Sequence, residues 1–303
     1  MNATSNTLGF VGTGNMGRRM ALRLLAAGFR LTVYDAFPAA TQPLVERGAT
    51  QCASPQEVAR HARIVLASLP GPKEVRDVLL GHDGILTAAK PGDLFIDFST
   101  NSPPRVKELV AEANKHGVDF LEAPVAGGTQ GAENGTLTIM VGGDASTLER
   151  ARPVLQPLAR SIVHMGGHGA GNATKLINNL MGMAHIYAAA EAMTLGVKAG
   201  LDPRKLYEAL AGGPVADVVL TQVFRTRALK GDFAPAFHLD LATKDETLAV
   251  EMGQELGAPM RMSRLVLDEY KAAQRDGLGG EDFTAVLKVL EKQMGVKVRL
   301  EGQ

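Results

Sequence analysis

Short apolar runs alternate with helix-like segments through the first half of the chain. The first of these runs are Leu8–Val11, Leu31–Tyr34, Ile64–Leu69 and Leu94–Phe98. This alternation is typical of strands that helices cover on both faces, as in a parallel sheet. Further strand-like runs follow at Val118–Leu121, Leu137–Val141 and Ser161–Met165. The pattern therefore predicts an α/β fold class, with a doubly wound domain of the Rossmann type over residues 1–166.

The pattern changes after residue 166. From Asn172 to about Ala199 most positions are apolar, which predicts one long and largely buried helix. Beyond it we find only helical periodicity, and breaks rich in glycine or proline divide this part into several helices. The breaks lie at residues 200, 212–214, 257–259 and 277–280. We therefore predict an all-α C-terminal domain over residues 167–303 that begins with the long interdomain helix.

Charge and cysteine content narrow the range of partners. Lys+Arg and Asp+Glu both number 32, so no net charge attracts the chain to nucleic acid or to an anionic membrane. Polar residues interrupt every apolar stretch before it reaches membrane-spanning length. Cys52 is the single cysteine, which excludes an intramolecular disulfide and a cysteine-based metal site, and the histidines have no metal-ligand spacing. We expect a cytoplasmic protein without a metal, a nucleic-acid partner or a membrane partner.

A glycine-rich turn separates the first predicted strand from the first predicted helix. Its sequence is Gly12-Thr13-Gly14-Asn15-Met16-Gly17. In a dinucleotide-binding turn the first glycine permits the tight turn, the second admits the pyrophosphate, and the third allows the helix to pack closely on the strand. The helix N-terminus then offers amide groups and a positive dipole to the phosphates. We interpret this turn as a dinucleotide site, and a turn that only caps a helix is the alternative.

Asp35 lies at the end of the second predicted strand, about 20 residues beyond the glycine turn. A carboxylate at this place can accept hydrogen bonds from the adenosine ribose and would repel a 2′-phosphate. Ala36 and Phe37 offer no arginine for such a phosphate. NAD is therefore favoured over NADP as the cofactor. The alternative is an aspartate that only forms the turn before Pro38.

Spaced motifs along the chain carry a family resemblance. They are GFVGTGNMG at 9–17, DFST at 97–100 followed by LEAPVAGG at 121–128, GAGNATKLINN at 169–179 and FHLDLATKD at 237–245. In this order they resemble the 3-hydroxyisobutyrate dehydrogenase family, also called the β-hydroxyacid dehydrogenases. The resemblance covers nearly the whole chain. Several motifs in the right order are far more specific than any one of them.

The resemblance implies cofactor contacts outside the glycine turn. Leu69 and Pro70 should lie against the cofactor, Thr100 should lie near the nicotinamide, and Lys244 should contact NAD. Each has a structural alternative. Thr100 is a candidate cap for the helix that follows it, and Lys244 with Asp245 is a candidate solvated ion pair.

The resemblance also implies the substrate side of the site. Lys175 is the implied catalytic residue, Asn179 should hold the substrate, and Asp245 should support the segment that closes the site. Ala126, Gly127 and Gly128 would receive the substrate carboxylate. The family commonly carries serine where this chain has Ala126, which removes one hydrogen-bond donor. Outside the family context Asn179 would be read as a residue of the helix surface.

The residue types agree with an alcohol oxidation. Hydride transfer from an alcohol needs a base for the hydroxyl proton, and a lysine at the start of an apolar helix needs a polar reason to be there. Asn179 is one helical turn beyond Lys175, so its amide can reach the same substrate. The stretch from Ala126 to Gly128 has little side chain, which leaves backbone amides to meet an anion.

Together with the resemblance, these residues predict NAD-dependent oxidation of a small carboxylate substrate, a 3-hydroxy acid of the 3-hydroxyisobutyrate type, to its semialdehyde. Tartronate semialdehyde reduction and 2-(hydroxymethyl)glutarate oxidation are alternatives within the same family. A non-catalytic NAD-binding module is an alternative of another class. The resemblance further implies a homodimer or a homotetramer.

Overall fold

The computed structural model describes residues 7–300 and divides between Lys175 and Leu176 into two compact units. The division falls inside the long helix α8 (Ala170–Lys198), which corresponds to the helix expected from Asn172 to about Ala199. Within residues 7–300 no helix has the length and apolar character needed to cross a membrane.

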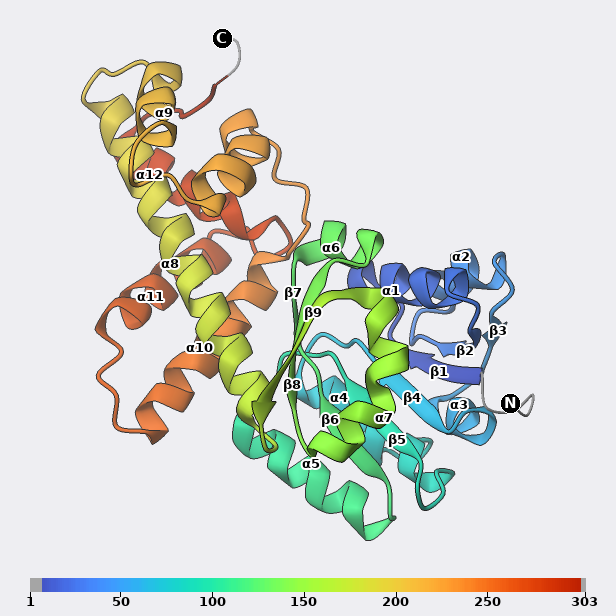
Figure 1. The fold of residues 1–303 in the computed structure, drawn as a ribbon. Helices are drawn as coiled ribbons and strands as arrows, with labels where there is room; N and C mark the ends of the chain where they lie inside the picture. Colours follow the sequence, from blue (N-terminus) through green and yellow to red (C-terminus); the bar gives the residue numbers. More distant parts are fainter. Residues whose placement is uncertain (1–6, 301–303) are drawn as a thin grey trace. The chain divides into compact units, whose positions relative to one another are not determined.

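The first unit is built on one mixed sheet (Figure 1). Its strands are β1 (Thr7–Val11), β2 (Arg30–Tyr34), β3 (Thr50–Gln51), β4 (Ile64–Ala67), β5 (Leu94–Asp97), β6 (Asp119–Glu122), β7 (Val125–Ala126), β8 (Leu137–Gly142) and β9 (Ala159–Gly166). They lie in the order β3-β2-β1-β4-β5-β6-β8-β7, with β9 paired to β8. All pairs from β3 to β6 are parallel, whereas β8 runs antiparallel to β6 and β7.

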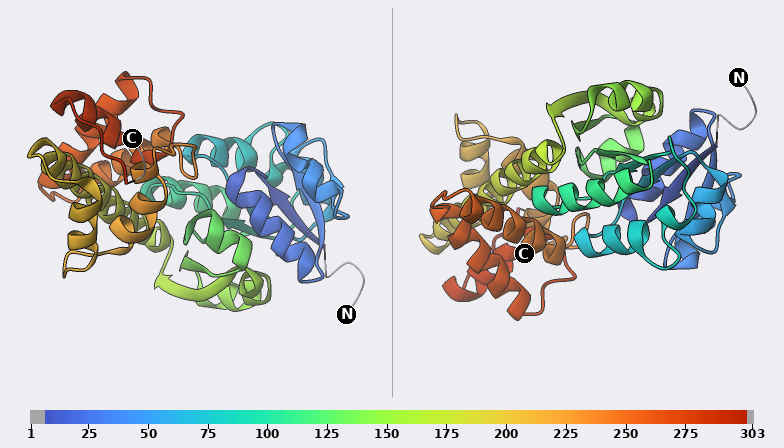
Figure 2. Two further views of the ribbon diagram at one scale, coloured as in Figure 1. Left: turned by 90° about the horizontal axis from the view of Figure 1, so that it is seen from above. Right: turned by 90° about the horizontal axis from the view of Figure 1, so that it is seen from below.

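Alternating residues of the central strands face two separate apolar layers. Phe10, Leu66 and Ile96 belong to one layer, and Val11, Val65 and Phe95 belong to the other. The first layer contains side chains of α1 (Asn15–Ala26), α6 (Gly128–Asn134) and α7 (Ala145–Leu155). The second contains side chains of α3 (Pro55–His61), α4 (Pro72–Leu80) and α5 (Pro103–Lys115). Figure 2 shows helices on both sides of the sheet, so the doubly wound prediction is confirmed.

The second unit is helical, as predicted. Beyond α8 it contains α9 (Pro203–Ala211), a π-helical stretch (Val219–Phe224), α10 (Leu239–Glu255), α11 (Arg261–Arg275) and α12 (Val286–Met294). The predicted breaks fall between these helices. Gly200 ends the α8 region at a φ of 87° that glycine tolerates, and Asp202 caps α9 by accepting hydrogen bonds from the backbone amides of Arg204 and Lys205.

The remaining helical pieces are short. They are α2 (Gln42–Val45) and the 3₁₀ turns Pro38–Thr41, Ile85–Thr87, Gln156–Leu158, Ala228–Lys230 and Phe283–Ala285. Two strands were absent from the prediction, β3 and β7. Each is only two residues long, which is too short for an alternating pattern to be recognised.

Glu246 is a buried acid on α10 in the second unit. Its side chain has no exposed surface, and neither carboxyl oxygen has a hydrogen-bond partner within residues 7–300. Burial, and after it the charge of Asp245, raises the pKa of Glu246 from 4.5 to about 7. The Tyr270 hydroxyl on α11 is also buried and unpartnered in this range. The core of this unit therefore favours the protonated form of Glu246.

This arrangement predicts a pH-dependent stability that Glu246→Gln removes. The folded protein binds the proton of Glu246 more tightly than the unfolded chain, so the stabilisation is complete below pH 4.5 and is lost as the pH rises to about 7. A shift of this size corresponds to on the order of 3 kcal/mol. Glu246→Gln should therefore be more stable than the unmodified protein at pH 8, and the difference should shrink toward pH 5.

Denaturant unfolding between pH 5 and pH 8 measures the effect. Glu251→Gln changes an exposed carboxylate on the same helix and should give a difference that does not vary with pH. Equal pH dependence in the two variants would show that Glu246 is ionised in the folded protein.

Candidate active site

The glycine turn between β1 and α1 has three distinct geometries. Gly12 has a φ of 84°, and a Cβ on it would lie 2.3 Å from the Ser68 carbonyl oxygen. A Cβ on Gly17 would lie 1.9 Å from the Gly12 carbonyl oxygen, so this position excludes any side chain. Gly14 has no atom within 4 Å of the corresponding point, and Asn15 and Met16 after it form the first turn of α1. The turn is tight at Gly12, open at Gly14 and closely packed at Gly17, which fits a dinucleotide pyrophosphate.

Asp35 links the end of β2 to this turn. Its Oδ2 accepts hydrogen bonds from the Thr13 amide at 2.6 Å and the Thr13 hydroxyl at 3.1 Å. Its Oδ1 accepts a hydrogen bond from the Phe37 amide at 2.9 Å, so the turn-forming interaction considered as the alternative is present. A carboxylate has about four acceptor sites. The two functions are therefore compatible, and a ribose contact remains a prediction.

Leu69 and Pro70 follow β4, and the Leu69 side chain lies beside the glycine turn. A Cβ on Gly12 would approach the Leu69 side chain to 2.8 Å, and the Leu69 amide donates a hydrogen bond to the Ser99 hydroxyl at 2.9 Å. Thr100 comes directly after Ser99 at the carboxyl end of β5. The next helix, α5, has Ser102 as its N-cap, so Thr100 does not occupy the capping position.

The stretch expected to receive a carboxylate leads from β7 into α6. Ala126 pairs with Thr138 of β8 and is half-buried. Gly127 and Gly128 have φ values of 124° and 60°, which favour glycine at both positions. No atom lies within 4 Å of the point where Gly128 would carry a Cβ. The backbone is therefore the main chemical group that these glycines present.

Lys175 is half-buried on α8 at the end of the first unit. Three buried polar residues that were not predicted as site residues connect the start of α8 to the sheet, namely Asn101, Glu122 and Asn172. Glu122 and Asn172 lie within motifs that were recognised. Their signal was a polar residue in an apolar context, at the end of the run Val118–Leu121 and at the start of the long apolar helix.

Asn179, Lys244 and Asp245 come together in the second unit. The Asn179 Nδ2 donates a hydrogen bond to Asp245 Oδ2 at 2.6 Å, and the Lys244 Nζ lies 2.8 Å from Asp245 Oδ1. The Asp245 side chain is 3% exposed, so this ion pair is not the solvated pair considered above. Asn178 is exposed and donates to the Asn179 Oδ1 at 3.0 Å. Both ends of the Asn179 amide are therefore held.

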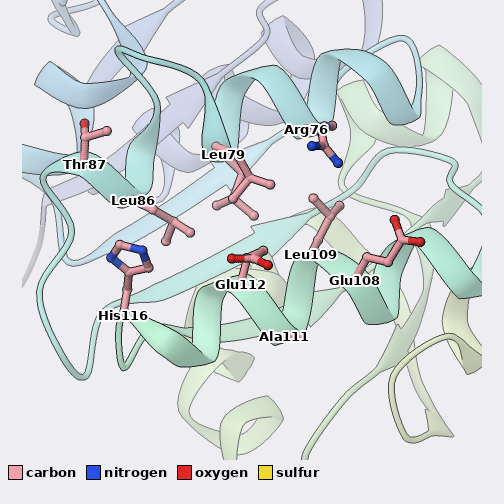
Figure 3. A pocket seen from close by; sticks show the side chains of 10 residues that line it. Arg76, Leu79, Leu86, Thr87, Glu108, Leu109, Ala111, Glu112 and His116 are labelled. Carbon is pink, nitrogen blue, oxygen red and sulfur yellow. The ribbon is translucent and has the colours of Figure 1, made fainter.

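A surface hollow of about 590 Å³ lies elsewhere on the first unit, between α4, α5 and the turn Ile85–Thr87 (Figure 3). Its floor contains Leu79, Leu86 and Leu109, and Glu112 on its rim pairs with Lys115. None of the candidate site residues lines it. This hollow is therefore separate from the candidate active site.

A glycine turn of this geometry on a doubly wound sheet, followed by an all-α unit, defines a dehydrogenase that uses a nicotinamide dinucleotide. The family model described as the NAD binding domain of 6-phosphogluconate dehydrogenase matches residues 7–167. The model described as NAD-binding of NADP-dependent 3-hydroxyisobutyrate dehydrogenase matches residues 169–290. The chain belongs to the 3-hydroxyisobutyrate dehydrogenase family and is an oxidoreductase that acts on CH–OH groups.

Individual relatives align over nearly the full chain. The 2-(hydroxymethyl)glutarate dehydrogenase of Eubacterium barkeri is 38% identical and covers 96% of this chain and 97% of its own. The NAD-dependent L-serine dehydrogenase of Pseudomonas aeruginosa is 36% identical over 95% of this chain and 99% of its own. The structure of Mycobacterium tuberculosis 3-hydroxyisobutyrate dehydrogenase with L-serine has a TM-score of 0.84 at 36% identity, over 94% of this chain and 99% of that one. The predicted family is confirmed.

The place of Asp35 predicts a preference for NAD over NADP that depends on its charge. Asp35→Asn keeps an acceptor for the turn and removes the negative charge that repels a 2′-phosphate, so the kcat/KM ratio of NAD to NADP should fall about tenfold or more. Initial rates with both cofactors measure the ratio. Asp83→Asn, an exposed change in the same unit, should leave the ratio unaltered. Equal or better kcat/KM with NADP in the unmodified protein would contradict the assignment.

Proposed function

We propose that this protein oxidises a small 3-hydroxy acid of the 3-hydroxyisobutyrate type to its semialdehyde with NAD, and that Lys175 is the general acid/base. The observation that carries the proposal is the pair Lys175 and Asn179 on one helix, with the Asn179 amide held by the buried Asp245 at 2.6 Å. Residues four positions apart on an α-helix lie on the same face. Both side chains can therefore address one substrate hydroxyl.

The proton is the part of the reaction that this chain's residues handle. In the oxidation, neutral Lys175 accepts the proton from the substrate hydroxyl at Nζ, and in the reduction its ammonium returns the proton to the aldehyde oxygen. The bound nicotinamide supplies the hydride acceptor. Asn179 has two hydrogens on Nδ2. One is donated to Asp245, and the other is donated to the substrate. Asp245 thus acts on the substrate by orienting Asn179.

The substrate carboxylate is assigned to Ala126, Gly127 and Gly128. The two positive φ values and the open space at Gly128 support an approach of the anion to backbone amides. For the cofactor we propose contacts with Leu69, whose side chain lies beside Gly12, and with Pro70, Thr100 and Lys244. These assignments follow the family resemblance.

Association and location form the last part of the proposal. The α8 residues Ile177, Met181 and Leu195 expose large apolar side chains, with exposed fractions of 52%, 54% and 60%. Exposed apolar surface of this kind supports association of copies into a homodimer or a homotetramer. We assign the protein to the cytoplasm, where the free thiol of Cys52 stays reduced.

The proposed role of Lys175 predicts a loss confined mainly to kcat. Lys175→Ala should lower kcat about 10²–10⁴-fold, the usual contribution of a general acid or base. Lys175→Arg should lose a similar amount, because arginine keeps the charge but does not release a proton near neutral pH. Lys198→Ala changes a lysine at the other end of α8 and should keep kcat.

NADH formation from a panel of hydroxy acids, together with NAD titration of each variant, makes the measurement. A folded Lys175→Ala protein that binds NAD and keeps most of its kcat would remove this lysine from the mechanism. Absence of turnover in the unmodified protein with every acid and semialdehyde of the panel would favour the non-catalytic NAD-binding module.

Ala126 supports a second candidate substrate, 2-(hydroxymethyl)glutarate. Alanine in place of the family's common serine leaves more space and one donor fewer, which suits a longer acid chain. The 38% identity to 2-(hydroxymethyl)glutarate dehydrogenase points the same way. Reduction of tartronate semialdehyde stays an alternative, since the 2-hydroxy-3-oxopropionate reductase of Escherichia coli is 34% identical to this chain. L-serine is itself a 3-hydroxy acid and belongs in the panel.

Ala126→Ser should shift the ranking of substrates toward the smaller acid. A methyl-sized change in a pocket alters selection by about 1–3 kcal/mol, so 3-hydroxyisobutyrate should gain about 10- to 100-fold in kcat/KM relative to 2-(hydroxymethyl)glutarate. Kinetics on the same panel measure the ranking, and Ala132→Ser on α6 is a control outside the proposed pocket. An unchanged ranking in Ala126→Ser would mean that a water-mediated contact replaces the serine hydroxyl at little cost.

A further inference from the structure

Glu122 at the end of β6 binds the start of α8. Its side chain has no exposed surface, and its Oε1 accepts hydrogen bonds from the backbone amides of Gly169 and of Gly171, the latter at 3.1 Å. Its Oε2 accepts a hydrogen bond from the Asn172 Nδ2 at 2.8 Å. One carboxylate therefore collects three N–H donors from the residues that begin the helix. Such charge-assisted bonds are stronger and more directional than neutral ones.

The packing around this carboxylate leaves no room for movement. Gly142 of β8 is paired with Glu122 on the neighbouring strand β6, and a Cβ on Gly142 would lie 2.0 Å from Glu122 Oε1. A Cβ on Gly171 would lie 2.5 Å from the Met140 carbonyl oxygen. Glycine at both positions allows the first turn of α8 to lie directly on the sheet. The start of the helix is therefore fixed from two sides.

Asn172 extends the same network to the cofactor side. It has no exposed surface, and its Oδ1 accepts a hydrogen bond from the Asn101 amide at 2.7 Å. Asn101 follows Thr100, which the proposed function places near the nicotinamide. Lys175 is in the next turn of α8 after Asn172. All of these residues belong to the first unit. The Asn172 side chain therefore joins α8 to the loop that contains residues 100 and 101, and the Glu122 carboxylate holds the amide group of Asn172 from the other side.

We propose that Glu122, acting through Asn172, is a positioning residue for Lys175 and sets the distance between this lysine and the loop around Thr100. This inference rests on the proposed function of Lys175 as the proton-transfer group. Glu122 touches neither substrate nor cofactor in this role. It holds the helix start so that Nζ is presented at the reacting carbon's hydroxyl, where a displacement of about 1 Å can reduce the rate about 10²-fold.

The hydrogen-bond polarity of the network gives a sharp test. In Glu122→Gln the new Nε2 faces the Asn172 Nδ2 or the amides of Gly169 and Gly171, so two donors meet in either orientation. In Asn172→Asp two carboxylates meet. In the double variant Glu122→Gln/Asn172→Asp, the new side-chain oxygen at position 122 accepts hydrogen bonds from the amides of Gly169 and Gly171. The new NH₂ group at position 122 donates to one carboxylate oxygen at position 172. The other carboxylate oxygen at position 172 accepts from the Asn101 amide. The double variant therefore restores every pairing.

Each single variant should lower kcat about 10- to 100-fold while KM for the acid and the Kd for NAD stay within about threefold. The double variant should recover kcat to within a few-fold of the unmodified protein. Asp93→Asn is the matched control. Asp93 is also buried and accepts a hydrogen bond from the Lys90 backbone amide at 2.7 Å. It lies just before the start of β5, whereas Thr100 and Asn101 follow the end of that strand. It should lower Tm and keep kcat.

A purely structural role for Glu122 gives a different result, in which Glu122→Gln loses Tm like Asp93→Asn and keeps kcat. That result, or losses in the double variant equal to the product of the single losses, overturns the proposal.

Amide hydrogen exchange of residues 169–175 supplies a readout that needs no turnover. Exchange should accelerate in each single variant and return in the double variant, and unchanged exchange in Glu122→Gln contradicts the network even where every substrate of the panel fails.

Discussion

Parallel pairing of β1, β2, β4, β5 and β6 brings the carboxyl ends of these strands to one edge of the sheet, and the candidate residues of the first unit depend on that edge. The glycine turn follows β1, Asp35 follows β2, and Leu69 follows β4. The strand order reverses direction at β1, since β2 lies on one side of it and β4 on the other. Loops separate at such a point and leave room for a ligand. Residues far apart in the sequence therefore gather there without any direct pairing signal between them.

The strands other than β3 and β7 could be predicted because most of their residues are apolar and form short runs between helical segments. The direction of β8 could not, because an apolar run has the same composition in a parallel and in an antiparallel pair. Asp35 illustrates the same limit at the site. Its type and place favour a ribose contact and are also compatible with a turn, and the structure contains the turn together with bonds to Thr13. Glu122 and Asn172 each gave a signal as a polar residue in an apolar context, but their pairing could not be predicted because the hydrogen bonds join residues 101, 122 and 172.

Glu122 and Glu246 are both fully buried glutamates, but they differ in the hydrogen-bond donors around them. Glu122 has three N–H donors within hydrogen-bond distance, so both of its carboxyl oxygens accept hydrogen bonds from the chain. Glu246 has no donor among the described residues, and its pKa rises to about 7 instead. In this protein one buried glutamate accepts hydrogen bonds from the chain around it, and the other has no such donor and a raised pKa. The first outcome occurs beside the proposed catalytic helix, and the second inside the core of the helical unit.

Helix α8 relates the two halves of the proposed chemistry by its own geometry. Lys175 belongs to the first unit and Asn179 to the second, yet four residues of an α-helix span only about 6 Å along its axis. Each residue has a buried acid of its own unit nearby. Asp245 on α10 accepts a hydrogen bond from Asn179, and Glu122 on β6 accepts one from Asn172, in the turn before Lys175. The spacing of the proposed proton-transfer group and the proposed substrate-binding amide therefore follows from a continuous helix.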